Sequence, residues 1–135
     1  GNKGALINNK GRKICLDNSD RSIREVIKMF YVEQTKKIVE SFIDRRRYDF
    51  PAQINKIRYK FYRGKWGSCS ARNNLSFNAY LSSAPLDVID YVVVHELCHT
   101  IIKNHSSNYW DLVSKYCPEF KRQRKYLKNN NIIVL

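Results

Sequence analysis

Hydrophobic residues return at helical spacing in the first third of this 135-residue chain. Between Ser22 and Arg47 they recur mostly every three or four positions, which predicts one long helix. Ser22 and Glu25 form a capping-box pattern, so we expect the helix to begin there. The apolar positions of this segment are Ile23, Val26, Ile27, Phe30, Ile38, Phe42 and Ile43.

A two-residue alternation of apolar and polar side chains follows in the middle of the chain. It runs over residues 57–62 and again over residues 75–81, as in strands with one buried face. We predict that these two strands pair around a turn at Asn73-Asn74. Gly64 and Gly67 indicate a turn or bulge between them.

A mostly apolar segment from Val88 to Ile102 predicts a buried helix. Pro85 stands near its start and Asp87 in its first turn, where a proline and an acidic side chain are favourable. We expect Asn104 to adopt the left-handed conformation that often ends such a helix.

Weaker signals lie toward the two ends of the chain. Residues 5–16 contain two short apolar stretches around a turn-rich tetrapeptide, which indicates a small hairpin or an entering strand. Ser106 or Ser107 can cap a further helix, and Pro118 with Glu119 can begin the last one. Together these elements are those of an α+β domain.

Length and composition indicate a single folded domain over residues 1–135. The chain is 43% hydrophobic and 27% charged, which lies outside the range of disordered proteins. No apolar run reaches the roughly 20 residues that span a bilayer, so we expect no membrane insertion. The cysteines form no CxxC pair and are interpreted as reduced thiols, which favours the cytoplasm; they are Cys15, Cys69, Cys98 and Cys117.

The formal net charge of +13 is unevenly distributed. Residues 45–72 hold nine basic side chains and one acid, and residues 115–128 hold six and one. The central segment 86–111 has four acids and only Lys103 as a lysine or arginine. A basic surround of this kind suits polyanions such as DNA, although scattered lysines and arginines also serve to keep a surface solvated.

Candidate chemistry lies within the apolar helix. His95-Glu96-Leu97-Cys98-His99 is an H-E-x-x-H motif, whose two histidines lie four residues apart and share one face of a helix. Burying such polar groups among valines costs several kcal/mol unless they are paired or coordinate a metal. The motif therefore predicts a metal site.

His105 provides a third imidazole, and the chain has no other histidines. A catalytic zinc ion usually has three protein ligands and an open position for water. A straight helix would carry His105 about 15 Å from His95 along its axis, so the chain must turn back near Asn104. We therefore expect His95, His99 and His105 to bind one zinc ion per chain.

Glu96 directly follows the first histidine and is the candidate catalytic base. Bound zinc lowers the pKa of its water toward about 7 and polarises an oxygen of the substrate. A carboxylate one residue after a ligand faces that water rather than the metal, which suits proton transfer.

Residues near the motif have simpler interpretations. Cys98 is interpreted as a small packing residue rather than as a thiolate ligand. Tyr109, Trp110 and Tyr116, with the aliphatic residues between them, predict a stripe that anchors a helix to the core rather than one that stacks a base or sugar.

From Lys65 onward the chain contains several short motifs that are specific to one protein family. They are Lys65-Trp66-Gly67-Ser68-Cys69-Ser70, Leu75-Ser76-Phe77-Asn78, Tyr91 to His99, Asn104-His105-Ser106-Ser107 with Trp110, Pro118-Glu119-Phe120-Lys121 and Leu127-Lys128. They are spread over residues 65–128, about half of the chain, and closely resemble the motifs of the YgjP-type metal-dependent hydrolases. A looser helical match reaches back through Tyr31. The chain looks shorter at its N-terminus than full family members, and Cys98 stands where small residues are usual.

This resemblance implies a minimal zincin-like fold, related to the SprT-like and WLM metallopeptidases. In such a fold the H-E-x-x-H helix packs beneath a small, mostly antiparallel sheet with flanking helices. The resemblance also implies that the metal ligands are His95, His99 and His105 and that Glu96 is the catalytic glutamate. Motif positions of unassigned role are matched by Trp66, Ser68, Cys69 and Asn78.

Among the functions that these observations allow, a zinc peptidase is favoured. We expect its extended peptide substrate to pair with the strand at 59–62 or 75–81 beside the metal. The resemblance implies a second possibility, because members of the family are also described as nucleoside triphosphate pyrophosphatases that act on UTP; such enzymes generally use Mg²⁺ held by carboxylates. The third is a nucleic-acid-binding module with a structural zinc, which requires Cys98 or Glu119 as a fourth ligand.

Overall fold

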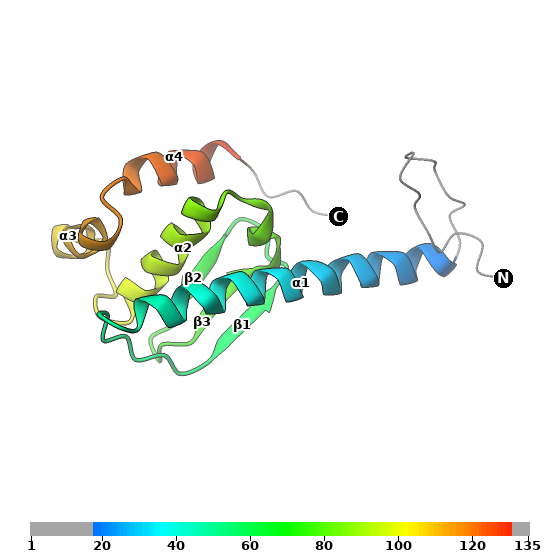
Figure 1. Ribbon diagram of the computed structural model, residues 1–135, viewed down its shortest axis with the longest axis horizontal. Coiled ribbons are helices and arrows are strands. Elements are labelled where there is room, and N and C mark those ends of the chain that lie inside the picture. Colours follow the sequence, from blue (N-terminus) through cyan, green and yellow to red (C-terminus); the bar gives the residue numbers. More distant parts are fainter. Residues whose placement is uncertain (1–17, 131–135) are drawn as a thin grey trace.

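The computed structural model describes residues 18–130 and shows helices packed on a small sheet (Figure 1). In chain order the described elements are α1 (Asn18–Arg46), β1 (Ile57–Lys60), β2 (Gly67–Cys69), β3 (Leu75–Asn78), the short 3-10 helix η1 (Ala79–Ser83), α2 (Leu86–His99), α3 (Ser107–Tyr116) and α4 (Phe120–Asn129). The predicted α+β class is confirmed. The hairpin expected within residues 5–16 lies outside the described residues.

The sheet is mixed and has the strand order β1-β3-β2, so β3 is central. β1 runs parallel to β3, and β2 runs antiparallel to it, so the sheet is mixed where a mostly antiparallel one was expected. The turn at Asn73-Asn74 therefore connects β2 to β3, and the prediction that it joins the two longer strands is wrong. β2 has only three residues, Gly67–Cys69, which is too short for an alternating pattern to appear. Asn73 supports the tight turn because its φ is 62°, a conformation that asparagine tolerates.

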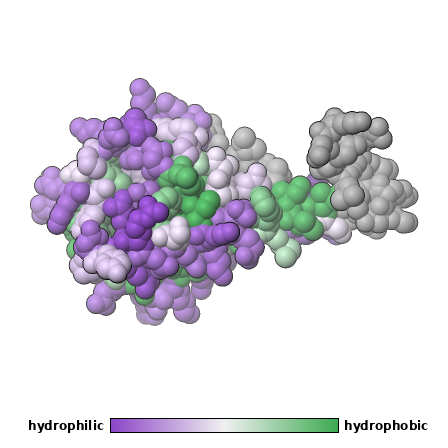
Figure 2. Space-filling model, viewed as in Figure 1, coloured by the Kyte–Doolittle hydropathy of each residue, from purple (hydrophilic) through white to green (hydrophobic). Residues whose placement is uncertain are grey.

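The two ends of α1 have different surroundings. Val39, Phe42 and Ile43 near its C-terminal end are buried in the core. Its N-terminal part extends beyond the body of the molecule (Figure 1), and there Val26 and Phe30 are 64% and 60% exposed. Figure 2 shows an apolar patch over this part of the helix.

The helix α1 begins at Asn18, so the prediction that Ser22 caps it is wrong. Ser22 lies within the helix instead. A capping-box pattern is compatible with a helix start but does not prevent the helix from continuing upstream of it.

Polar side chains fix α1 to the body of the domain at two points. The buried Thr35 hydroxyl donates to Ala79 O at 2.6 Å and accepts from Ser82 N at 3.1 Å. Near the end of the helix, the Arg46 guanidinium donates to both carboxylate oxygens of Asp90 on α2, at 3.3 and 2.6 Å. The Thr35 bonds hold α1 against η1, and the Arg46 bonds hold it against α2.

α2 is buried on nearly every side, as its apolar sequence predicted. It ends at His99, three residues before the predicted end, where the Thr100 hydroxyl donates back to Leu97 O at 2.6 Å. The left-handed conformation expected at Asn104 is wrong, because Asn73 is the only described residue other than glycine with a positive φ. The buried side chains of α2 are Val88, Ile89, Tyr91, Val92, Val93, Val94, Glu96, Leu97, Cys98 and His99.

Two short helices complete the domain and pack against α2. Ser106 caps α3 by accepting a hydrogen bond from Tyr109 N at 3.4 Å, and α4 begins directly after Glu119, as predicted. Cys98 is fully buried, which confirms its packing role. None of the described helices combines the length and apolar character needed to cross a membrane.

Candidate metal centre and active site

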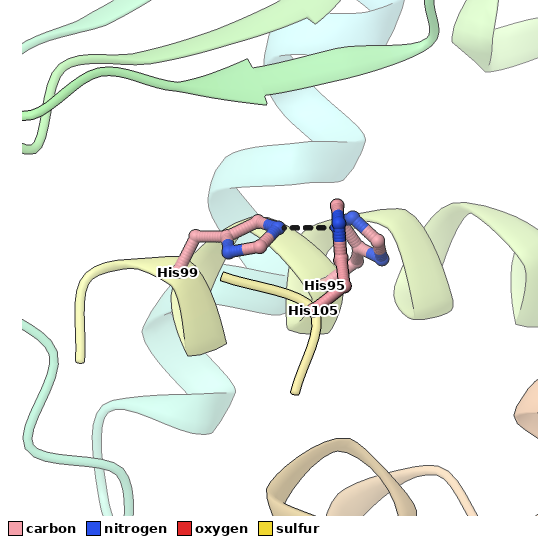
Figure 3. A group of neighbouring side chains, drawn as sticks. All are labelled: His95, His99 and His105. Atoms are coloured by element: carbon pink, nitrogen blue, oxygen red, sulfur yellow. Dashed lines mark hydrogen bonds between the residues drawn. The ribbon is translucent and has the colours of Figure 1, made fainter. Parts of the chain in front are cut away.

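Three histidine side chains meet at the C-terminal end of α2 (Figure 3). His95 and His99 come from successive turns of α2, and His105 comes from the loop that follows. One ring nitrogen from each lies within 4.8 Å of the other two. The Nε2 atoms of His99 and His105 are 3.0 Å apart. The predicted return of the chain toward α2 is therefore confirmed.

The loop between His99 and His105 is held by hydrogen bonds. His99 Nδ1 lies 2.9 Å from Ile102 O, so the opposite nitrogen of the ring is the one that faces His105. Lys103 Nζ donates to Ser70 O at 3.0 Å and thereby ties this loop to the turn between β2 and β3.

Aromatic side chains of α3 pack directly against the histidines. The Tyr109 ring stacks on His99 with centroids 4.3 Å apart, and its hydroxyl donates to His95 O at 2.8 Å. The Trp110 ring stacks on His105 with centroids 5.7 Å apart. The expectation that these residues anchor a helix to the core is confirmed for Tyr109, which is fully buried. Their contact with the histidine cluster was not apparent from the sequence.

A contact with Tyr91 orients the ring of His95. The Tyr91 hydroxyl lies 3.0 Å from His95 Nδ1, which leaves Nε2 for the cluster. Burial, together with the neighbouring His99 and His105 and the charge of Arg124, lowers the pKa of His95 to about 3. The imidazole is therefore neutral near pH 7 and keeps a lone pair for a metal.

Glu96 lies on α2 between the two histidines of the motif and is only 4% exposed. Burial raises the pKa of its carboxyl group to about 8, and the charge of Lys65 acts in the opposite direction. The side chain passes close to the backbone of β2. A Cβ placed on Gly67 would lie 3.0 Å from Glu96 Oε2, so glycine is what allows this approach.

Two cavities meet at Gly67, His95 and Glu96. The first has a volume of about 300 Å³ and contains the whole histidine cluster, with β2 and Lys103 in its walls. The second, of about 220 Å³, extends between α2, α4 and Trp66. A molecule bound at Glu96 therefore has space on both sides.

The motif positions of unassigned role lie along one side of this site. Asn78 is fully buried and donates to Tyr62 O and Lys65 O at 2.8 and 2.9 Å, so it fixes the loop before β2. Trp66 lines the smaller cavity, and Ser68 and Cys69 line the larger one. Asn78 shapes the fold, whereas the other three border the site.

The donor atoms of the cluster fit a zinc ion. A tetrahedral zinc about 2.1 Å from each nitrogen separates the nitrogens by roughly 3.4 Å, which lies between the 3.0 and 4.8 Å found here. Imidazole suits zinc better than it suits Mg²⁺. Within residues 18–130 this is the one group of three or more potential metal ligands, and neither Cys98 nor Glu119 belongs to it.

An H-E-x-x-H helix that meets a third histidine beside a small sheet is the arrangement of a metal-dependent hydrolase of the metallopeptidase class. Comparison with protein families supports this class. The profile of the YgjP-like metallopeptidase domain matches residues 2–130, and the chain belongs to this family.

Solved structures with the same fold include two archaeal metallopeptidase zymogens. Jannalysin of Methanocaldococcus jannaschii is 24% identical with a TM-score of 0.50, and the match covers 69% of this chain and 97% of that one. Abylysin of Pyrococcus abyssi is 20% identical with a TM-score of 0.56, and the match covers 73% and 99%. A comparison with curated proteins gave no significant match.

Proposed function

We propose that this chain is a zinc peptidase in which His95, His99 and His105 hold the ion and Glu96 is the general base. The observation that supports this most directly is the convergence of the three imidazoles next to Glu96 at the wall of one cavity. Bound zinc supplies an activated water and polarises the carbonyl group of the bond that is cleaved.

Glu96 moves the protons of the reaction. Its carboxylate borders the same cavity as the three histidines and makes no hydrogen bond to any described residue, so its oxygens are available to a water. A zinc ion held by the three histidines would favour the ionised form of this buried group, because a nearby positive charge lowers the pKa of a carboxyl group. In the proposed mechanism the carboxylate then accepts a proton from the attacking water and passes it to the leaving amine. Close contact with the backbone at Gly67 limits the movement of the side chain.

The free edge of β2 is the proposed binding surface for an extended peptide. β2 pairs with β3 on one side only, and its residues Gly67, Ser68 and Cys69 line the cavity that contains the histidines. A peptide strand can add to such an edge through backbone hydrogen bonds. The strands that we expected in this role are unsuitable, because β3 is paired on both sides and β1 lies at the opposite edge of the sheet.

The two alternative functions receive no support from the described residues. A Mg²⁺-dependent pyrophosphatase that acts on UTP requires a cluster of carboxylates, and none is found within residues 18–130. A closed structural zinc site requires a fourth ligand. Cys98 is buried in the core and Glu119 pairs with Arg122, so neither completes the site.

We also propose a cytoplasmic location. Cys69, Cys98 and Cys117 are free thiols in the described part of the chain, which is the state that a reducing compartment maintains. Recovery of the chain with secreted proteins in cell fractionation would contradict this location.

The experiment that tests the proposed function compares wild type with Glu96→Gln and His95→Ala on a mixed peptide library, with products identified by mass spectrometry. We expect Glu96→Gln to retain the metal and to lose at least about 100-fold in cleavage rate, because that is the usual contribution of a general base. His95→Ala should lose both metal and activity. Glu119→Gln is the matched control, because this exposed carboxylate pairs with Arg122 and does not line the cavity of the histidine cluster. A Glu96→Gln variant as active as the control would overturn the proposed role of Glu96. Hydrolysis of UTP by wild type without cleavage of any peptide would overturn the assignment as a peptidase.

A further inference from the structure

The smaller cavity beside Glu96 has walls of mixed chemistry. Trp66, Val92 and Leu127 form apolar surface, while the Tyr91 hydroxyl and the Arg124 guanidinium are its polar contributors next to the site. Its volume of about 220 Å³ is large enough for an amino-acid side chain. None of these residues takes part in the proton transfer that we propose for Glu96.

Arg124 has no carboxylate partner among the described residues. Two other arginines close to α2 do: Arg122 pairs with Asp87 at 2.9 Å, and Arg46 pairs with Asp90. Arg124 instead places its guanidinium over an aromatic ring, with the central carbon 4.4 Å from the ring centroid of Trp110. This stacking orients the planar group and leaves its N–H donors for another ligand.

The stacking partner of Arg124 belongs to the wall of the histidine cluster. The Trp110 ring also stacks on His105, so the guanidinium is positioned by the same aromatic group that packs against the site. Arg124 also lines the same cavity as His95 and Glu96. A cation with free N–H donors therefore lines a cavity that has apolar walls on one part and includes Glu96.

We propose that this cavity selects peptides by binding a carboxylate of the residue that flanks the cleaved bond, with Arg124 as its receptor. The inference rests on the proposed peptidase function. Both cavities include Gly67, His95 and Glu96. A peptide whose cleaved bond lies beside the Glu96 side chain therefore places the residue next to that bond in the smaller cavity. A methylene stem would contact Trp66 and Leu127, and the carboxylate would form the paired, charge-assisted hydrogen bonds that arginine favours.

Matched peptides test this selection. We would compare hexapeptides that carry Glu or Gln at each position flanking the cleaved bond, and measure the ratio of their cleavage rates. Wild type should cleave the Glu peptide about 10- to 100-fold faster at one flanking position, as expected for a charge-assisted pair. Arg124→Gln should reduce this ratio to near one. Arg124→Glu should reverse the ratio, so that the Gln peptide is cleaved faster than the Glu peptide.

The matched control is Lys125→Gln, which removes one positive charge from the same helix at an exposed position outside the cavity. It should keep the full preference for Glu. An equal loss of preference in Lys125→Gln would mean that the net charge of the chain, rather than Arg124, attracts acidic peptides, and would overturn the proposal. A wild-type ratio near one at every position would overturn it as well.

The carboxylate can belong to a side chain or to the C-terminus of the peptide, and the same assay separates the two. Preference for internal Glu in peptides with an amidated C-terminus indicates the side chain, whereas preference for the free acid over the amide indicates the terminus. Loss of preference in Arg124→Gln supports the proposal in either case.

A binding measurement separates failure of this inference from failure of the proposed function. If wild type cleaves no peptide, the proposed function fails. Binding can still be measured by titrating an N-acetylated hexapeptide with a central Glu into the Glu96→Gln variant. Tryptophan fluorescence reports this binding because Trp66 lines the cavity. Binding that weakens about 10-fold or more in Glu96→Gln/Arg124→Gln supports the carboxylate site. Equal affinity of the two variants contradicts it.

Discussion

Replacing Gly67 with alanine should displace the Glu96 carboxylate, the proposed general base, without removing any functional group. The new Cβ would lie 3.0 Å from Glu96 Oε2, 3.2 Å from Glu96 Cγ and 3.2 Å from Ser76 O, whereas ordinary contacts begin near 3.4 Å. Ser76 belongs to the central strand and is paired on both sides, so its backbone cannot readily move. The Glu96 side chain must therefore shift by about 0.4 Å, the difference between 3.4 and 3.0 Å.

The size of the effect follows from that shift. A misplacement of about 1 Å in an active site costs about 100-fold in rate, so a shift of about 0.4 Å should lower the cleavage rate of Gly67→Ala about 5- to 10-fold. Overpacking should also cost about 1–3 kcal/mol of folding free energy. The metal content should not change, because Gly67 contacts Glu96 rather than a histidine of the cluster.

The matched control is Gly64→Ala, in which the same methyl group meets nothing within 4 Å. Its positive φ of 76° makes alanine unfavourable by roughly 1–2 kcal/mol, so its stability loss should resemble that of Gly67→Ala. Peptide cleavage rate, metal content and urea unfolding would be measured for both variants. Cleavage by Gly67→Ala at the wild-type rate, or an equal loss of rate in both variants, would refute the placement of Glu96 against β2.

Other predictions concern single hydrogen bonds. Tyr91→Phe removes the hydroxyl beside His95 Nδ1 and should weaken zinc binding about 10-fold in a chelator competition, and an unchanged affinity would show that the bond does not orient the ring. Asp90→Asn leaves Arg46 half-buried without its carboxylate and should cost about 2 kcal/mol in urea unfolding, with metal content intact. Asn78→Ala removes two bonds to backbone carbonyls of the loop before β2 and should cost a similar amount; a cost below about 0.5 kcal/mol would contradict its role in fixing that loop.

The parts of the fold that could be predicted are those with long periodic patterns. The alternation at residues 57–62 and the apolar run after Pro85 predicted β1 and α2, because side-chain burial there follows the period of the element. The strand β2 could not be predicted, since three residues show no period. Strand orientation also depends on contacts between distant segments, which is why the sequence predicted that β1 and β3 pair but not that they run parallel.

Some residues of the candidate site could be predicted from the sequence, and others could not. The spacing of His95, His99 and His105 was sufficient to predict that the three side chains meet. Tyr91 could have been found as well, because it lies four residues before His95 on the same helix face. Arg124 could not, since nothing in a basic helix distinguishes the arginine that reaches a cavity from its neighbours.

The most direct test of the central claim is the zinc content of wild type and His105→Ala, measured by mass spectrometry after dialysis. If three histidines hold the ion, wild type contains one zinc per chain and His105→Ala loses it, because only His95 and His99 remain as ligands. Retention of one zinc per chain in His105→Ala, or its absence from wild type, would contradict the proposed metal centre.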